Sequence, residues 1–100
     1  MITPETRKSL QMANLADDGE LIAAIGSTTR IVLVAVTCTV GMNLKETDTN
    51  GDVICHVGAG MNRFPSLITM APNTALFAED VHGTGGNITA FYYTISTDGE

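Results

Sequence analysis

Short hydrophobic runs follow one another along most of the chain and are separated by residues typical of turns. The longest run covers residues 30–40 (RIVLVAVTCTV), which are rich in β-branched side chains and carry no charge after Arg30. Its first half is apolar on both faces, as in a strand at the centre of a sheet, and its second half alternates between apolar residues and threonine. Residues 30–40 therefore predict one long central strand.

Shorter runs on both sides of this segment predict further strands. Turn signals lie at residues 26–29 (GSTT), 48–52 (DTNGD), 71–74 (APNT) and 82–87 (HGTGGN), and the Asn-Gly pair at 50–51 favours a β-hairpin. We expect strands over residues 20–25, 42–47, 53–57, 66–70, 75–78 and 88–96, with 42–47 at an edge and 58–65 as a loop. This spacing predicts an all-β, jelly-roll-like antiparallel β-sandwich.

The strand over residues 88–96 places Phe91, Tyr93 and Ile95 on one face, because side chains alternate along a strand. We expect this face to point inward. The core is therefore predicted to include Phe91 on this strand and Val34 on the long central strand.

The first nineteen residues differ from the rest and predict an N-terminal arm or short helix, with the sandwich domain over residues 20–100. Residues 3–5 (Thr-Pro-Glu) are typical of a helix start, and residues 7–16 contain good helix formers. Its apolar residues form only an irregular stripe, so this helix would be marginal alone in water: Leu10, Met12, Ala13 and Leu15. We expect the arm to order either against its own sandwich or against a neighbouring subunit.

Composition narrows the class of function. The chain has 5 basic and 11 acidic residues and no basic stripe, which argues against nucleic-acid binding. No apolar stretch is long enough to span a membrane, and no apolar segment follows the first positive charges, so we expect neither a membrane segment nor a signal peptide.

Charged residues make up 16% of the chain, against a norm of about 25%. Neighbours can cover such a weakly charged surface at low desolvation cost, which predicts a homo-oligomer, with a trimer as one possibility.

The two cysteines, Cys38 and Cys55, each lie inside an apolar strand segment. Without secretion we expect both to be free thiols made in a reducing cytoplasm and to act as small core residues. A disulfide between them is the alternative.

Candidate chemical sites have simpler structural explanations. Residues 46–52 place oxygen-bearing side chains at alternate positions, as a calcium loop does, but the loop would begin with Glu46 and end with Val57 in place of the bidentate glutamate. A hairpin turn accounts for the same residues, so we expect no metal. The glycine-rich segment 82–87 precedes a strand rather than the helix of a phosphate loop. No serine or cysteine has a positioned base, so we expect no enzyme activity and no cofactor.

One segment suggests a contact with a partner. In residues 63–65 (Arg-Phe-Pro), a large aromatic side chain stands in a loop otherwise rich in glycine and asparagine. Phe64 is either an exposed anchor, as arginine and aromatic residues are at interfaces, or it folds back to close one end of the sandwich. The predicted partner-contact residues are those of this segment and of the arm: Arg7, Lys8, Leu10, Met12, Leu15, Arg63 and Phe64.

The order of segments resembles small jelly-roll or sandwich proteins of tailed-phage virions. The likeness lies in residues 21–30 (LIAAIGSTTR), 31–40 (IVLVAVTCTV), 43–54 (NLKETDTNGDVI), 68–79 (ITMAPNTALFAE) and 83–95 (GTGGNITAFYYTI). The resemblance implies a virion component made in the host cytoplasm, with the major capsid protein or another virion protein as partner. It favours a capsid decoration protein whose arm clamps a neighbouring subunit. The alternative is a tail or spike module that binds glycan or a host surface, although the chain has no Trp and 2 Tyr.

Overall fold

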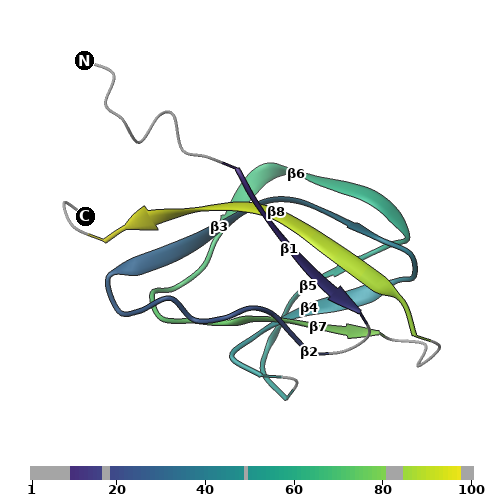
Figure 1. Ribbon diagram of the computed structural model, residues 1–100, viewed down its shortest axis with the longest axis horizontal. Coiled ribbons are helices and arrows are strands. Elements are labelled where there is room, and N and C mark those ends of the chain that lie inside the picture. Colours follow the sequence, from purple (N-terminus) through teal and green to yellow (C-terminus); the bar gives the residue numbers. More distant parts are fainter. Residues whose placement is uncertain (1–9, 17–18, 49, 81–84, 98–100) are drawn as a thin grey trace.

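The computed structural model describes residues 10–16, 19–48, 50–80 and 85–97, and all regular elements among them are β-strands. The strands are β1 (Gln11–Ala16), β2 (Gly19–Ile22), β3 (Thr29–Cys38), β4 (Met42–Glu46), β5 (Val53–Val57), β6 (Gly60–Thr69), β7 (Leu76–Asp80) and β8 (Asn87–Ser96). They form two antiparallel four-stranded sheets that pack face to face (Figure 1). The predicted all-β antiparallel sandwich is confirmed.

We name each sheet after a central strand. The β3 sheet has the order β1-β8-β3-β6 and the β4 sheet has the order β2-β7-β4-β5. In Figure 1 the β3 sheet forms the upper layer and the β4 sheet the lower layer. Consecutive strands β1 and β2 lie at edges of different sheets, so the chain crosses between the layers within its first two strands.

The core lies between the sheets and takes alternate residues from their central strands. Leu33 of β3, Leu44 of β4 and Leu76 of β7 are completely buried. Leu33 pairs with Tyr92 and Ala35 pairs with Phe91, so Val34 is an extra residue that forms a β-bulge. The bulge shifts by one residue which side chains of β3 point toward the core. The other buried members of the core cluster are Leu21, Ile22, Ile31, Val36, Cys38, Met42, Val57, Met70, Ala78, Ile88 and Ala90.

The helix predicted within the first nineteen residues is wrong for the part that the structure describes. Residues 11–16 form β1, which pairs with β8 over six consecutive residues. Ala13 and Leu15 pack against the core, whereas Met12 is exposed. Helix propensity is a weak preference, and here the free edge of β8 offers both hydrogen bonds and apolar contacts that an isolated helix lacks.

Two other segments also differ from expectation. Residues 58–65 were expected to form a loop, but β6 begins at Gly60 and continues through Pro65. A proline is tolerated there because β6 is an edge strand whose pairing with β3 is irregular between Arg63 and Ile68. The segment 42–47 was expected at an edge, but β4 lies between β7 and β5, with Met42 and Leu44 fully buried.

The inward face of the last strand is the reverse of the prediction. Ile88 and Ala90 are buried in the core and Tyr92 packs against it. Phe91 therefore points to the outer side of the β3 sheet, and Val34, the bulge residue, is only half-buried. Neither Phe91 nor Val34 belongs to the core cluster.

The hairpin predicted at the Asn-Gly pair is confirmed between β4 and β5. The Asp48 carboxylate accepts a hydrogen bond from the Asn50 amide at 2.8 Å, and the Glu46 amide donates to the Asp52 carbonyl at 3.1 Å. A Cβ atom at Gly51 would collide with the Glu46 carbonyl oxygen, so the turn requires glycine at this position.

Candidate interaction surface on the β3 sheet

The outer face of the β3 sheet carries a row of side chains that crosses all four strands. Met12 of β1 is level with Phe91 of β8, Phe91 with Ala35 of β3, and Ala35 with Arg63 of β6. Residues that pair across antiparallel strands share a face, so these four side chains lie on the same side of the sheet. Three of them are apolar and one is cationic.

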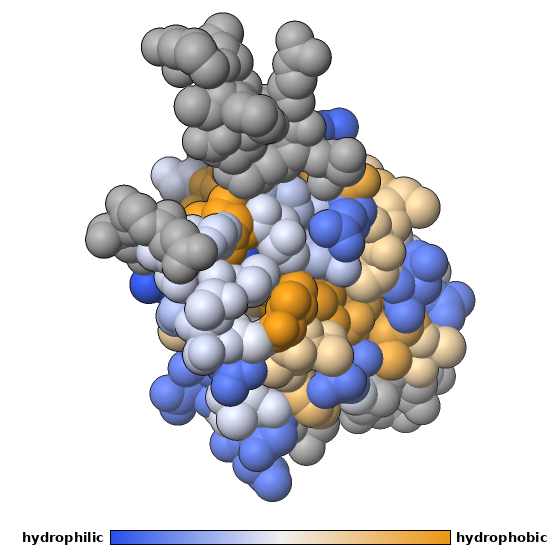
Figure 2. All heavy atoms as spheres, turned by 60° about the vertical axis from the view of Figure 1, so that its left-hand side comes forward, coloured by the Kyte–Doolittle hydropathy of each residue, from blue (hydrophilic) through white to orange (hydrophobic). Residues whose placement is uncertain are grey.

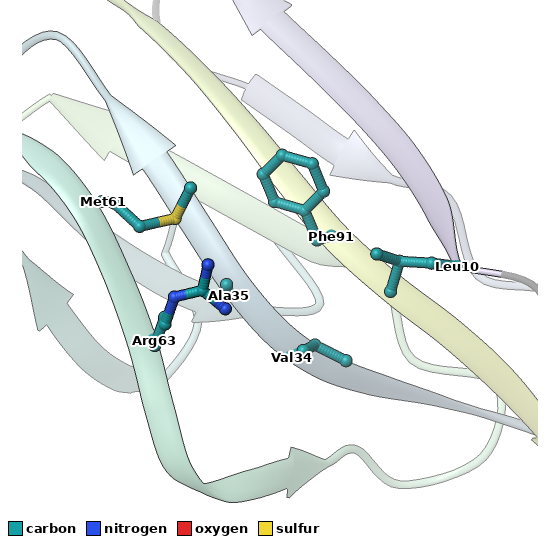
Figure 3. A pocket seen from close by; sticks show the side chains of 6 residues that line it. All are labelled: Leu10, Val34, Ala35, Met61, Arg63 and Phe91. Carbon is teal, nitrogen blue, oxygen red and sulfur yellow. The ribbon is translucent and has the colours of Figure 1, made fainter.

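A hollow of about 170 Å³ lies at this row and is lined by Leu10, Val34, Ala35, Met61, Arg63 and Phe91 (Figure 3). The Phe91 ring stands on β8, between Leu10 of the chain leading into β1 and Met61 of β6, and the Arg63 guanidinium reaches from β6 toward β3. Small-molecule pockets usually measure about 300–1,000 Å³. The hollow is therefore better matched to a single side chain of a partner. We call these six residues together with Met12 the outer patch.

Large apolar side chains of the outer patch are exposed to solvent. Met12 is 63% exposed, Leu10 is 56% exposed and Met61 is 53% exposed. The space-filling view, which brings the left-hand side of Figure 1 forward, shows hydrophobic atoms at the surface among hydrophilic side chains (Figure 2). Contiguous apolar surface on a soluble domain is typical of sites that bind other molecules.

The outer face of the β4 sheet carries ionic and hydrogen-bonding side chains, although Phe77 of β7 and the exposed Val53 of β5 lie level with Lys45 on the same face. The Lys45 ammonium and the Glu79 carboxylate form an ion pair at 3.0 Å across β4 and β7. The His56 Nδ1 atom and the Asn43 Oδ1 atom lie 3.1 Å apart across β5 and β4. These four polar side chains therefore interact in pairs across neighbouring strands of the β4 sheet.

Charge follows the same division between the sheets. Among the described residues, the strands of the β3 sheet contain two arginines, Arg30 and Arg63, and no acidic residue. The described acidic residues belong to the strands of the β4 sheet or to its hairpin turn: Glu20, Glu46, Asp48, Asp52, Glu79 and Asp80. The outer patch is therefore an apolar and locally cationic surface on a chain of net charge −6.

The structure brings together three of the predicted partner-contact residues. Leu10, Met12 and Arg63 all belong to the outer patch, although they come from opposite edges of the sheet. Leu15 and Phe64 instead pack against the core. Of the two predictions for Phe64, the structure therefore agrees with the one in which its ring folds back onto the sandwich. Arg7 and Lys8 lie outside the described residues.

Sequence reasoning missed Val34, Ala35, Met61 and Phe91 as members of the surface. The signal was present in the first half of residues 30–40 and in residues 88–95, where both faces of the strand are largely apolar. A strand that is covered on only one side needs only one apolar face. A second apolar face therefore indicates either a covered sheet or an exposed interaction surface.

Both cysteines are free thiols, as predicted. Cys38 is buried and donates a hydrogen bond to the Gly58 carbonyl at 3.0 Å, and Cys55 packs against the core cluster. Burial raises the pKa of both thiols above the ordinary value, because it disfavours the charged thiolate. Among the residues that the structure describes, no three His, Cys, Asp or Glu side chains are grouped so that they could hold a metal ion.

Comparison with protein-family models, curated proteins and solved structures gave no significant match. Within the described part of the chain, no helix has the length and apolar character needed to cross a membrane. The outer patch and the sequence resemblance are therefore the features that point to a function.

Proposed function

We propose that this protein is a non-enzymatic structural component of a phage virion that binds a neighbouring subunit through the outer patch. The preferred role is that of a capsid decoration protein, which stabilises the head by bridging subunits of the major capsid protein. The observation that carries this proposal is the contrast between the two outer faces. The outer face of the β4 sheet carries an ion pair between neighbouring strands, whereas the outer face of the β3 sheet exposes Leu10, Met12 and Met61 around a hollow.

The chemistry of the outer patch defines the kind of surface that it fits. An apolar side chain of the partner would fill the hollow beside Phe91 and release water from both surfaces. A carboxylate next to that side chain would pair with Arg63, whose guanidinium is suited to bidentate contacts. Arginine and aromatic side chains contribute strongly at protein interfaces, and both are present here.

The second candidate is a tail or spike module that binds glycan or a host surface. The observation in its favour is the Phe91 ring at the hollow, because aromatic rings stack on sugar rings. Sugar hydroxyls also need several hydrogen-bonding partners, and Arg63 is the one charged residue among the six that line the hollow. This shortage of polar groups favours a protein partner.

Locating the chain in a purified particle tests the proposal. Virions would be prepared from the phage that encodes the chain and labelled with an antibody raised against residues 20–100. The decoration role predicts label distributed over the head. Label confined to the tail or spike would favour the second candidate, and the absence of the chain from intact particles would contradict both.

A further inference from the structure

Exposed apolar side chains occur at two places outside the β3 sheet. The large apolar side chains that are exposed in the described part of the chain are Leu10, Met12, Ile25, Val53, Met61 and Leu67. Three of them belong to the outer patch, and Leu67 lies on β6 of the same sheet. The remaining two are Ile25, which lies between β2 and β3, and Val53, which begins β5. On a second copy of this chain, these two side chains are the candidates for filling the hollow of the outer patch.

Val53 has the acidic neighbour that the outer patch requires. The hollow takes an apolar side chain, and Arg63 at its wall takes a carboxylate. Val53 is 53% exposed and directly follows Asp52, which is exposed in the turn of the β4–β5 hairpin. Ile25 lies in a segment, residues 23–28, that carries no charge. Packing two outer patches together would supply no carboxylate and would bring two arginines to one contact. The hairpin is therefore the part of a second copy that matches the patch.

The hairpin and the outer patch lie on opposite sides of the molecule. The hairpin belongs to the β4 sheet, and its turn projects downward from the lower layer in Figure 1, away from the β3 sheet. The outer patch lies on the face of the β3 sheet that points away from the β4 sheet. A hairpin therefore cannot enter the hollow of its own chain. Because the two surfaces face in opposite directions, two copies also cannot exchange both contacts about one two-fold axis.

We propose that the β4–β5 hairpin of one copy docks into the outer patch of the next, so that free chains associate head to tail. The Val53 side chain enters the hollow beside the Phe91 ring, and the Asp52 carboxylate pairs with the Arg63 guanidinium. The turn is already held by its own hydrogen bonds, such as that from the Glu46 amide to the Asp52 carbonyl at 3.1 Å. Little conformational freedom is therefore lost when the hairpin docks.

The distribution of charge favours this arrangement. The described acidic residues belong to the β4 sheet or its hairpin turn, whereas the described strands of the β3 sheet contain arginines and no acidic residue. Stacking copies in one direction places the acidic side of each against the cationic side of the next. Lys45 lies level with Val53, but its ammonium forms an ion pair with Glu79 at 3.0 Å, so it adds no net charge there. Contacts of this kind build a closed ring or an open chain.

This inference does not depend on the proposed function, although both use the outer patch. A hairpin and a capsid subunit cannot occupy one hollow at the same time. In concentrated free protein, the patch is covered by the hairpin of another copy. On the particle, the capsid partner takes the place of that hairpin.

Sedimentation of the full chain over a range of concentrations tests the contact. We expect the native chain to associate as its concentration rises. Val53→Asp and Met61→Asp should each weaken association at least about tenfold, because each would bury a carboxylate in an apolar contact. Ile25→Asp is the matched control, since Ile25 is 48% exposed and lies outside both surfaces. It should leave association unchanged.

Mixing the two weakened variants tests the head-to-tail geometry. Val53→Asp keeps an intact outer patch, and Met61→Asp keeps an intact hairpin. An equimolar mixture therefore contains one working contact for each pair of chains. It should form a dimer with one chain of each variant, with the affinity of the native contact, and nothing larger. An interface between identical surfaces predicts no such recovery.

Charge exchange tests the predicted ion pair. Asp52→Arg and Arg63→Asp should each weaken association by about tenfold or more, because like charges then meet at the contact. The double variant Asp52→Arg with Arg63→Asp should restore it. Failure of the double variant to recover would overturn the pairing of these two residues.

Three results would overturn the inference as a whole. These are a native chain that stays monomeric at all concentrations, an Ile25→Asp variant as defective as Val53→Asp, and a mixture of Val53→Asp with Met61→Asp that does not recover. The proposed function is tested separately by the affinity of Val53→Asp for the purified capsid, because this variant keeps the outer patch. It should bind the capsid as tightly as the native chain does, and a loss of capsid binding would contradict the use of one hollow by both partners.

Discussion

The outer faces of the two sheets are built by the same alternation of side chains along a strand, yet their chemistry differs. On the β4 sheet, Lys45 and Glu79 are paired across neighbouring strands. On the β3 sheet, the corresponding positions hold Met12, Phe91 and Ala35 beside Arg63. The core needs only the inner face of each sheet. Folding of the single chain does not require the apolar side chains on the outer face of the β3 sheet, and the proposed binding of a partner would account for them.

The largest expected effect is a difference in stability between variants on the inner face and variants on the outer face of the β3 sheet. Leu33→Ala should lower the free energy of unfolding by about 2–5 kcal/mol, because Leu33 is completely buried and its loss leaves a cavity. Phe91→Ala should cost only about 1–2 kcal/mol, because Phe91 is half-buried beside an open hollow. Urea denaturation of both variants measures the difference. Equal losses would place Phe91 in the core and remove the contrast.

The next effect concerns binding rather than stability. Met61→Asp puts a carboxylate into the outer patch, which a partner would then have to desolvate. We expect affinity for the purified capsid to fall by about thirtyfold or more, the size expected at a central interface position. His56→Asp adds the same charge to the exposed outer face of the β4 sheet and should leave affinity unchanged. If the two variants bound equally well, the outer patch would not be the contact surface.

The smallest effect concerns the polar face. Glu79→Gln removes the ion pair with Lys45, in which the Glu79 side chain is 36% exposed. The loss in unfolding free energy should be below about 1 kcal/mol, because solvent screens the pair. It should shrink further in about 1 M salt, where the Debye length is about 3 Å. Denaturation curves at low and high salt give this comparison. A large effect that salt does not change would mean that this face is buried in some assembly.

The sequence was sufficient to predict the sandwich, the long central strand and the hairpin at the Asn-Gly pair. It was insufficient where local and tertiary preferences disagree. Residues 7–16 contain good helix formers, but residues 11–16 find a partner in β8, which no local pattern reveals. Pro65 and the surrounding glycines are typical of a loop, yet an edge strand accommodates them.

The wrong inward face predicted for β8 and the absence of the outer patch from the sequence-based prediction have one cause. Periodicity assigns a strand's inward face only when its two faces differ in polarity. In residues 88–95, Ile88, Ala90 and Tyr92 alternate with Phe91, Tyr93 and Ile95, so both faces are apolar. The bulge at Val34 also shifts the alternation of inward and outward side chains along β3, and the hydrophobic pattern of the sequence does not reveal this shift. The same ambiguity that misplaced Phe91 was the sequence signal for a second apolar surface.

Methionine oxidation measures the central claim most directly, because the chain carries matched residues on and off the outer patch. Met12 and Met61 are 63% and 53% exposed, whereas Met42 and Met70 are 0% and 4% exposed. In the dilute free protein, mild peroxide should oxidise Met12 and Met61 and spare the other two. In the assembled particle, Met12 and Met61 should become protected. Undiminished oxidation of Met12 and Met61 in the particle would contradict the claim that the outer face of the β3 sheet binds the partner.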